Sequence, residues 1–424
     1  EIARLDRELA VHRGRQQAQR RQRYEAACAA RAQAQALVDD LEAQRSRHGT
    51  PPDVETLRKA QEDLNYLNTV SANQKLAQRQ AAERCCLRAE LRLYLLVTAL
   101  SQGVTVLFAQ TGAAVTWITP LCMLPGLALL GIAALCKRFT GAPTLTEAFQ
   151  AGLHPLAAVL WRGYVTLALL WQGEAALTEV VCLFTEGVVM NIAPFGMAAV
   201  TVVTALCCCQ RKGLPRCVWL LRYPLLVLLA LLFFELTWNG HWDYLLPLSG
   251  AGNAANRTLF LDMTAMGWPL ILFAELPARE KGQRRDTGPL PALLLLCLLL
   301  GAVAFSLPTE LALTGKNLAD AMLLPMVFLT PVNRLLALTG WVLGLLLALA
   351  VSLRRSAALA PGKPAREMLF CVALGVALLL PHLWDEQRLR GVLKLVQPYL
   401  LLPGAVLILC LLPGAVLCKR RRKP

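Results

Sequence analysis

Long apolar runs alternate with short polar segments from about residue 93 to the last residues of the chain. Each run approaches the roughly 20 apolar residues that a helix needs to cross the hydrocarbon core of a bilayer. The pattern therefore predicts about ten membrane-spanning helices joined by short loops. Their expected bounds are 93–111, 116–136, 155–181, 188–209, 217–238, 257–277, 289–308, 335–353, 367–384 and 392–417. The tenth is long and is expected to bend at Pro398, Pro403 or Pro413.

The first 92 residues have a different pattern, in which charged and polar side chains dominate. Segment 2–47 holds good helix formers and no proline, and a turn at residues 48–53 precedes a second helical pattern. Apolar residues keep heptad spacing only over short stretches, so a sustained coiled coil is not indicated. We expect an all-α protein with a soluble helical coil or hairpin over 1–92 and a ten-helix membrane domain over 93–424.

Basic residues outnumber acidic ones, which gives a formal net charge of +15. If the amino terminus is inside, the predicted cytoplasmic loops and tail carry eighteen Lys and Arg residues and the predicted external loops carry four. Membrane proteins enrich their cytoplasmic loops in this way. The charge thus predicts two cytoplasmic termini and contact with anionic lipid headgroups rather than with nucleic acid.

Residues that carry chemistry in enzymes are scattered along the chain. The five histidines are dispersed, and neither a Gly-rich phosphate loop nor the sequence order of a catalytic triad is visible. Cys207, Cys208, Cys209 and Cys217 flank one basic loop but lack the CxxC spacing of zinc sites. We therefore expect a non-enzyme that holds no metal and no cofactor.

Glutamates inside the predicted spans are candidate functional groups, because a charge at mid-bilayer costs roughly 2.5–3.5 kcal/mol. Glu174 shares a helix face with Thr178 but not with Gln172. Glu174 is a candidate cation or proton site, or a partner for an ammonium group. Glu179 and Glu186 lie near the expected outer end of the same span, where water contact is the alternative explanation.

Two further glutamates have simpler explanations in the sequence. Glu235 lies in an aromatic-rich segment near the end of the fifth span, and we expect it to extend to interfacial water. Glu275 precedes Arg279 by four residues, which predicts a local ion pair at the end of the sixth span.

Several short strings occur in an order that resembles the endospore germination permeases. They are Thr178-Glu179, Ala193-Pro194, the Arg211–Arg216 basic loop, the Asp243–Leu248 element, and Arg334 with Trp341. These permeases are the B subunits of nutrient germinant receptors, within the amino acid/polyamine/organocation transporter superfamily. The resemblance covers about residues 93–424. Residues 1–92 look more like part of an ATPase-type coiled coil, and a chimeric gene prediction is an open alternative for them.

The resemblance implies a LeuT-like helical bundle that binds a small nutrient, such as an amino acid, where spans one and six are unwound. The matching small or polar residues are Gln102 and Gly103 in span one, and Thr264 and Gly267 in span six, with Glu174 as a further polar contributor. A proline kink without a ligand is the alternative explanation of Gly267 and Pro269.

The resemblance further implies a receptor subunit in the inner spore membrane that works with other germinant-receptor subunits to trigger germination. Two other functions stay open. One is an amino acid/cation symporter of the same superfamily. The other is a scaffold anchored by its membrane part, which the short heptad stretches do not favour.

Overall fold

The computed structural model of the chain contains two compact units, Glu1–Arg84 and Cys85–Pro424. The residues it describes in the first unit are 29, 31–40, 42–43, 61–62 and 65–66. In the second unit they are 87–104, 114–188, 193–209, 213–238, 240–245, 266–276, 288–306, 331–359, 364–383 and 386–421. Residues 31–40 of the first unit are helical, and Gln35 Nε2 donates to Asp39 Oδ1 at 3.0 Å, one helical turn away.

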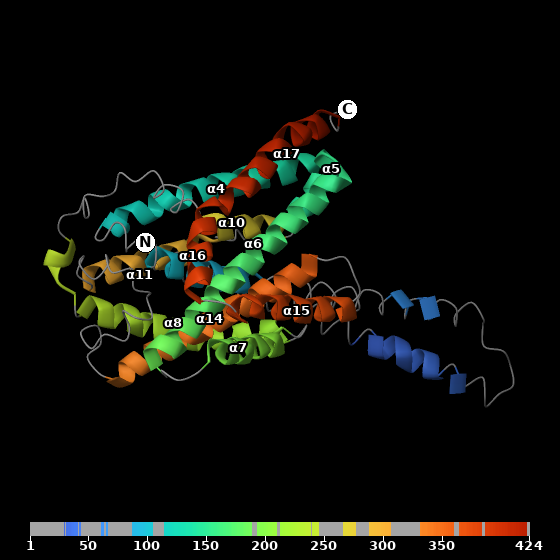
Figure 1. Cartoon of the computed structure of the whole chain (residues 1–424). Helices are drawn as coiled ribbons and strands as arrows, with labels where there is room; N and C mark the ends of the chain where they lie inside the picture. The colour runs from blue at the N-terminus through green and yellow to red at the C-terminus, as the bar shows by residue number, and fades with distance from the viewer. Residues whose placement is uncertain are drawn as a thin grey trace, which may run out of the picture. The chain divides into compact units, whose positions relative to one another are not determined.

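The second unit is a bundle of helices (Figure 1). A helix over residues 87–102 comes first and continues as a π-helical turn at 103–104. The helices that follow are α4 (Val115–Thr140), α5 (Leu145–Gly152), α6 (Pro155–Cys182), α7 (Pro194–Cys208), α8 (Gly213–Trp238), α10 (Trp268–Ile271), α11 (Leu290–Ser306), α14 (Pro331–Leu359), α15 (Pro364–Leu379), α16 (Glu386–Val396) and α17 (Leu401–Arg421). Short turns of other helix types are η3 (Leu183–Val188), η4 (Trp242–Leu245), η5 (Leu272–Glu275), η6 (Pro381–Leu383) and η7 (Gln397–Tyr399).

The chain is an all-α polytopic membrane protein, as the hydropathy pattern predicts. Within the described residues, five segments are long and apolar enough to cross a membrane: Val115–Thr140, Pro155–Thr185, Pro331–Leu359, Arg366–Leu383 and Arg388–Arg420. Shorter apolar helices cover Pro194–Cys208, Tyr223–Trp238 and Leu290–Ser306. Each of these eight segments coincides with one predicted span. The predicted bend of the last span occurs at Pro398, where the 3-10 turn η7 separates α16 from α17.

Local sequence signals explain where several helices begin and end. The Thr144 side chain accepts a hydrogen bond from the Glu147 N–H at 3.3 Å, which caps α5. His154 Nδ1 accepts from the Leu156 N–H at 3.2 Å, and Pro155 occupies the first position of α6, where no N–H is needed. At the other end of α4, Gly141 has a φ of 65°, the left-handed conformation that ends many helices.

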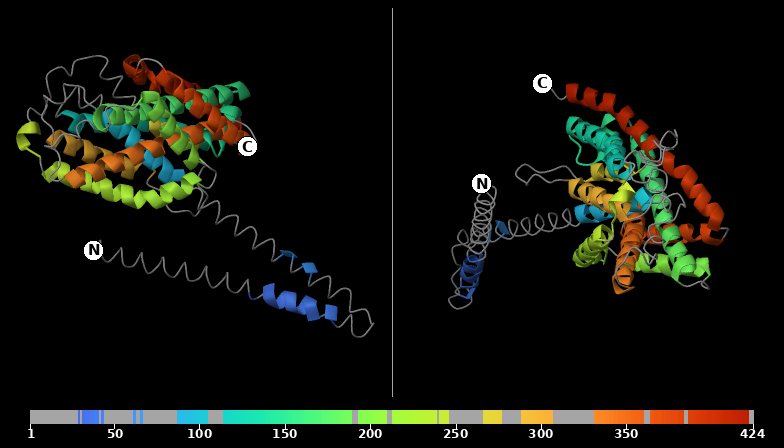
Figure 2. Two further views of the ribbon diagram at one scale, coloured as in Figure 1. Left: turned by 60° about the horizontal axis from the view of Figure 1, so that its bottom comes forward. Right: turned by 90° about the vertical axis from the view of Figure 1, so that its left-hand side faces the viewer.

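The helices α6 and α14 cross at the centre of the second unit and pack against each other (Figure 1 and Figure 2). Small residues allow close approach at such crossings. A methyl group added to Gly173 of α6 would lie 3.2 Å from Ser352 Cβ of α14. The same addition to Gly344 of α14 would lie 3.1 Å from Val97 in helix 87–102. The three helices therefore form one tightly packed group.

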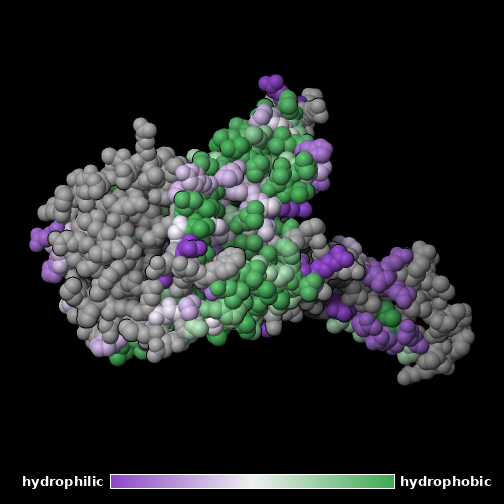
Figure 3. Space-filling model, viewed as in Figure 1, coloured by the Kyte–Doolittle hydropathy of each residue, from purple (hydrophilic) through white to green (hydrophobic). Residues whose placement is uncertain are grey.

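The outer faces of the bundle are apolar, as expected of surfaces that contact lipid. On α6 the exposed side chains include Leu156, Val159, Leu160 and Leu167. On α17 they include Leu402, Val406, Leu409 and Leu417. Figure 3 shows hydrophobic side chains over much of the described surface on this face of the second unit.

Candidate functional site

Two described helical segments, one ending at a π turn and one starting after a turn, meet within the second unit. Helix 87–102 changes to a π turn at Gly103, and α10 begins after a turn at Met266 and Gly267. A methyl group added to Gly103 would lie 3.1 Å from Met266 Cε, so these two segments approach each other. Interrupted membrane helices leave backbone groups available to bind ligands.

A pair of buried amides lies beside the first interruption. Gln102 Nε2 donates to Gln172 Oε1 of α6 at 2.8 Å, and the two residues are 7% and 2% exposed. Gln102 Oε1 and Gln172 Nε2 have no partner among the described residues. An unpaired buried polar atom costs roughly 1–3 kcal/mol. The amide pair therefore offers one acceptor and one donor to a small polar ligand.

A carboxylate lies next to this pair on the same face of α6. Glu179 Oε2 accepts from Ser101 Oγ, and Glu179 Oε1 accepts from Trp341 Nε1 of α14 at 3.0 Å. Gln172 and Glu179 share a face because they are seven residues apart. Glu179 is 6% exposed, so its explanation as a water-contacting interfacial residue is wrong. The i, i+7 spacing could have identified the pair, but no sequence signal indicated Ser101 as a partner.

The structure places Glu174 on the opposite side of α6. Glu174 Oε1 lies 3.0 Å from His382 Nε2 of η6, and both residues are buried. Of the five candidate ligand residues, Gln102 and Gly103 lie at the end of helix 87–102 and its π turn, and Gly267 precedes α10. Glu174 lies apart from them, beside His382. Thr264 is outside the described residues.

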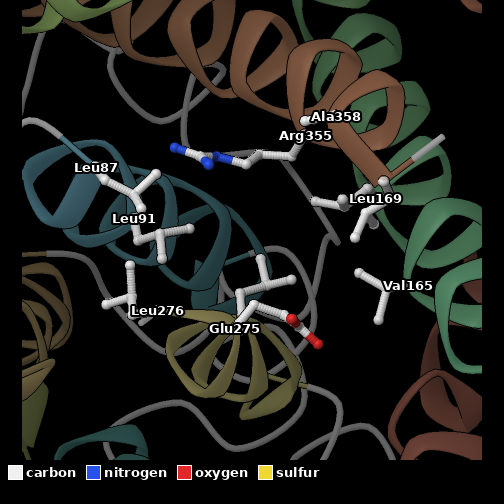
Figure 4. Close-up of a pocket in the computed structure, with 10 residues that line it drawn as sticks. Leu87, Leu91, Val165, Leu169, Glu275, Leu276, Arg355 and Ala358 are labelled. Atoms are coloured by element: carbon white, nitrogen blue, oxygen red, sulfur yellow. The ribbon is translucent and has the colours of Figure 1, made fainter. Parts of the chain in front are cut away.

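A cavity of about 180 Å³ lies between helix 87–102, α6, η5 and α14 (Figure 4). Leucines line most of it, with Arg355 and Glu275 as its polar groups. Arg355 Nη2 also lies 2.5 Å from Glu90 Oε2, and Glu90 is 2% exposed. Glu90 lies within helix 87–102, in the second unit rather than the first. This ion pair joins helix 87–102 to the end of α14.

Glu275 is a junction between several helices. It accepts from Trp161 Nε1 of α6 and from Thr146 Oγ1 of α5 at 3.0 Å. Lys137 Nζ of α4 donates to the Ala274 carbonyl at 2.9 Å in the same turn. The expected local partner Arg279 is outside the described residues, so the Glu275–Arg279 ion pair stays a prediction. The contacts of Glu275 with Trp161 and Thr146 were not predicted. The interaction is tertiary, which a spacing of four residues does not reveal.

The environment of Glu235 also differs from the one that the sequence predicted. It is 1% exposed and accepts a hydrogen bond from Asn333 Nδ2 of α14. The prediction that Glu235 extends to interfacial water is therefore wrong. Its aromatic neighbours Phe234 and Trp238 are exposed, at 52% and 65%.

Replacing Trp161 with phenylalanine should lower the stability of the protein by about 1–3 kcal/mol, because it removes a donor to the Glu275 carboxylate. Trp171→Phe is the matched control. Trp171 Nε1 is buried and has no partner among the described residues, so its removal should be neutral or slightly stabilising. Thermal unfolding in detergent measures both variants. Equal destabilisation by the two substitutions would contradict the role of the Trp161–Glu275 bond.

Comparison with known proteins adds evidence on the fold. No protein-family model matches the chain, and no curated protein matches its sequence. Among solved structures, MhsT in complex with L-phenylalanine aligns with a TM-score of 0.50 and 16% identity, over 78% of this chain and 92% of MhsT. A mutant manganese transporter of Eremococcus coleocola aligns with a TM-score of 0.47 and 13% identity, over 78% and 77% of the two chains.

The alignment with MhsT shows the fold and no more. The chain has the LeuT-like arrangement of an integral membrane protein, in agreement with the fold class that the sequence predicts. Helix 87–102 with its π turn overlaps the predicted first span, 93–111. The short helix α10 lies within the predicted sixth span.

Proposed function

We propose that this chain is a permease-like membrane protein that binds a small amino acid between its interrupted first and sixth spans. One observation carries the proposal: the Gln102–Gln172 pair keeps an unpaired acceptor and an unpaired donor buried beside the interruption at Gly103. An amino acid has both an ammonium donor and carboxylate acceptors, so it satisfies both atoms. The MhsT structure, which has this fold, holds L-phenylalanine.

The physiological role in this proposal is that of a sensing subunit of a spore germinant receptor. It rests on the resemblance of Thr178-Glu179, the Arg211–Arg216 loop and the Arg334…Trp341 pair to the germination permeases. The protein would reside in the inner spore membrane with both termini cytoplasmic. Ligand binding would shift the bundle and act on partner receptor subunits. A sensor of this kind binds its ligand without accumulating it.

Retention of labelled amino acids by proteoliposomes tests the proposal. Saturable retention near one ligand per protein, indifferent to Na⁺ and H⁺ gradients, is the expected result for a sensor. The double variant Gln102→Leu/Gln172→Leu should bind the labelled amino acid at this central site with an affinity at least tenfold lower than that of the wild type. The double change leaves no amide without its partner, so folding is preserved. Wild-type affinity in the double variant would overturn the assignment.

The matched control is Gln397→Leu in η7. Gln397 is a buried glutamine, 7% exposed, whose Nε2 has no partner among the described residues. It lies in the turn between α16 and α17, away from Gly103 and Gly267, so its loss should leave central binding unchanged. Reduced binding in this variant would mean that any buried glutamine substitution disturbs the bundle.

Glu179 favours a second candidate function, amino acid/cation symport. A buried carboxylate that contacts Ser101, next to the interrupted helix, is a group that can couple a cation or proton to a substrate. If the protein is a symporter, an imposed gradient should drive accumulation beyond one ligand per protein. Glu179→Gln should then abolish the accumulation and leave equilibrium binding within threefold of wild type. Retention indifferent to gradients would exclude this function.

A further inference from the structure

Cysteines around the end of α7 form two pairs in the structure. The thiols of Cys208 in α7 and Cys217 in α8 contact each other, and so do those of Cys209 and Cys371 in α15. The helix α7 ends at Cys208, α8 begins at Gly213, and the two helices pack against each other. Within the part of the chain that the structure describes, no group of three or more His, Cys, Asp or Glu side chains could hold a metal ion. Each pair is therefore a dithiol.

The two dithiols differ in their access to solvent. Cys208 and Cys217 are both partly exposed free thiols. Cys209 and Cys371 are 5% and 3% exposed, and their thiols donate to backbone carbonyls of α14 at 3.3 and 3.5 Å. Reactive cysteines are accessible, whereas cysteines buried in apolar surroundings are inert. Of the two pairs, Cys208–Cys217 therefore combines contact between two thiols with access to a reagent.

A positive charge lies directly beside the accessible dithiol. Arg216 precedes Cys217 in α8 and is exposed. Arg211 and Lys212 belong to the same basic loop of the sequence. A cluster of one charge sign raises the local concentration of reagents of the opposite sign. An anionic reagent is therefore attracted to the Cys217 end of the pair, and Cys208 lies next to the place where it reacts.

We propose that Cys208 and Cys217 form a modification site for small anionic disulfides, with glutathione disulfide as the probe. The Cys217 thiolate attacks one sulfur of the probe and releases the first glutathione thiol. Cys208 then attacks the Cys217 sulfur, forms the Cys208–Cys217 disulfide and releases the second glutathione. Two protein thiols are oxidised, one small disulfide is reduced, and the two thiol protons leave with the two glutathione molecules. The new bond joins the end of α7 to the start of α8.

Treatment of the reduced, purified full chain with glutathione disulfide tests the proposal, followed by alkylation of the remaining thiols, tryptic digestion and mass spectrometry. Trypsin cleaves within the basic loop, so Cys208 falls on peptide 163–211 and Cys217 on peptide 217–222, which holds no other cysteine. We expect a disulfide to join these two peptides. The Cys208→Ser variant should instead accumulate glutathione on Cys217, because the second thiol is missing. A merely structural cysteine would not produce this trapped intermediate.

Two controls accompany this measurement. Cys207→Ser removes an exposed thiol next to the pair and should leave the cross-link unchanged. The buried Cys209–Cys371 pair, which also has two thiols in contact, should form its disulfide at least tenfold more slowly. The proposal is overturned if peptides 163–211 and 217–222 are not joined, or if they are still joined in Cys208→Ser. Equal rates for the two pairs would overturn it as well. The site is independent of the proposed central site.

Discussion

Replacing Arg355 with leucine should destabilise the protein by about 3–5 kcal/mol, because it leaves the Glu90 carboxylate buried without its cation. Glu90 is 2% exposed, whereas the side chain of Arg355 is 25% exposed. The pair joins helix 87–102 to α14, so its loss should also loosen the cavity that both helices line (Figure 4). Thermal unfolding of the detergent-purified protein, with cysteine accessibility of a Leu91→Cys variant, measures both effects.

The double variant Glu90→Leu/Arg355→Leu separates the buried charge from the packing. It removes both partners, and substituting a buried ion pair by apolar side chains is often neutral or stabilising. We therefore expect the double variant to recover most of the stability that the single variant loses. Arg366→Leu, on the exposed start of α15, controls for the loss of one positive charge. A single variant as stable as Arg366→Leu would contradict the role given to the pair.

Replacing Gly126 with alanine should also destabilise the protein strongly, although it adds only one methyl group. The new Cβ would lie 2.5 Å from the Gly267 carbonyl oxygen and 2.9 Å from Gly267 Cα. These are backbone atoms, which cannot rotate away as a side chain does, so α4 and the start of α10 must separate. Overpacking costs about 1–3 kcal/mol in general and more where the backbone itself must move. Amino acid binding at the proposed central site should fall at least tenfold with it.

Gly131→Ala in the same helix is the matched control. A Cβ at Gly131 meets no atom within 4 Å, and alanine is the better helix former by about 0.8–1.0 kcal/mol. This substitution should leave stability unchanged or raise it slightly. A loss of stability in Gly126→Ala together with a gain of stability in Gly131→Ala would establish the close approach of Gly126 and Gly267. A stable Gly126→Ala variant with normal binding would contradict it.

The arrangement of α6 explains how one helix can serve two regions of the protein. Gln172 and Glu179 point to helix 87–102 and α14, whereas Glu174 points to His382. The two faces follow directly from the helical rotation of about 100° per residue. Glu174 and Gln102 are both polar and buried, at 5% and 7% exposure. They face different sides of α6, so Glu174 does not complete the Gln102–Gln172 pair.

The sequence by itself determined the all-α membrane class and the bounds of most spans, because hydropathy acts locally. It limited the bend of the last span to three prolines, and the structure places it at Pro398. It also determined that Gln172 and Glu174 face different ways. Only the tertiary structure decided which partners meet: Gln102 with Gln172, Glu90 with Arg355, and Glu275 with Trp161. The reason is physical. Lipid and protein interior are both apolar, so hydropathy does not specify how each helix is rotated or which helix it contacts.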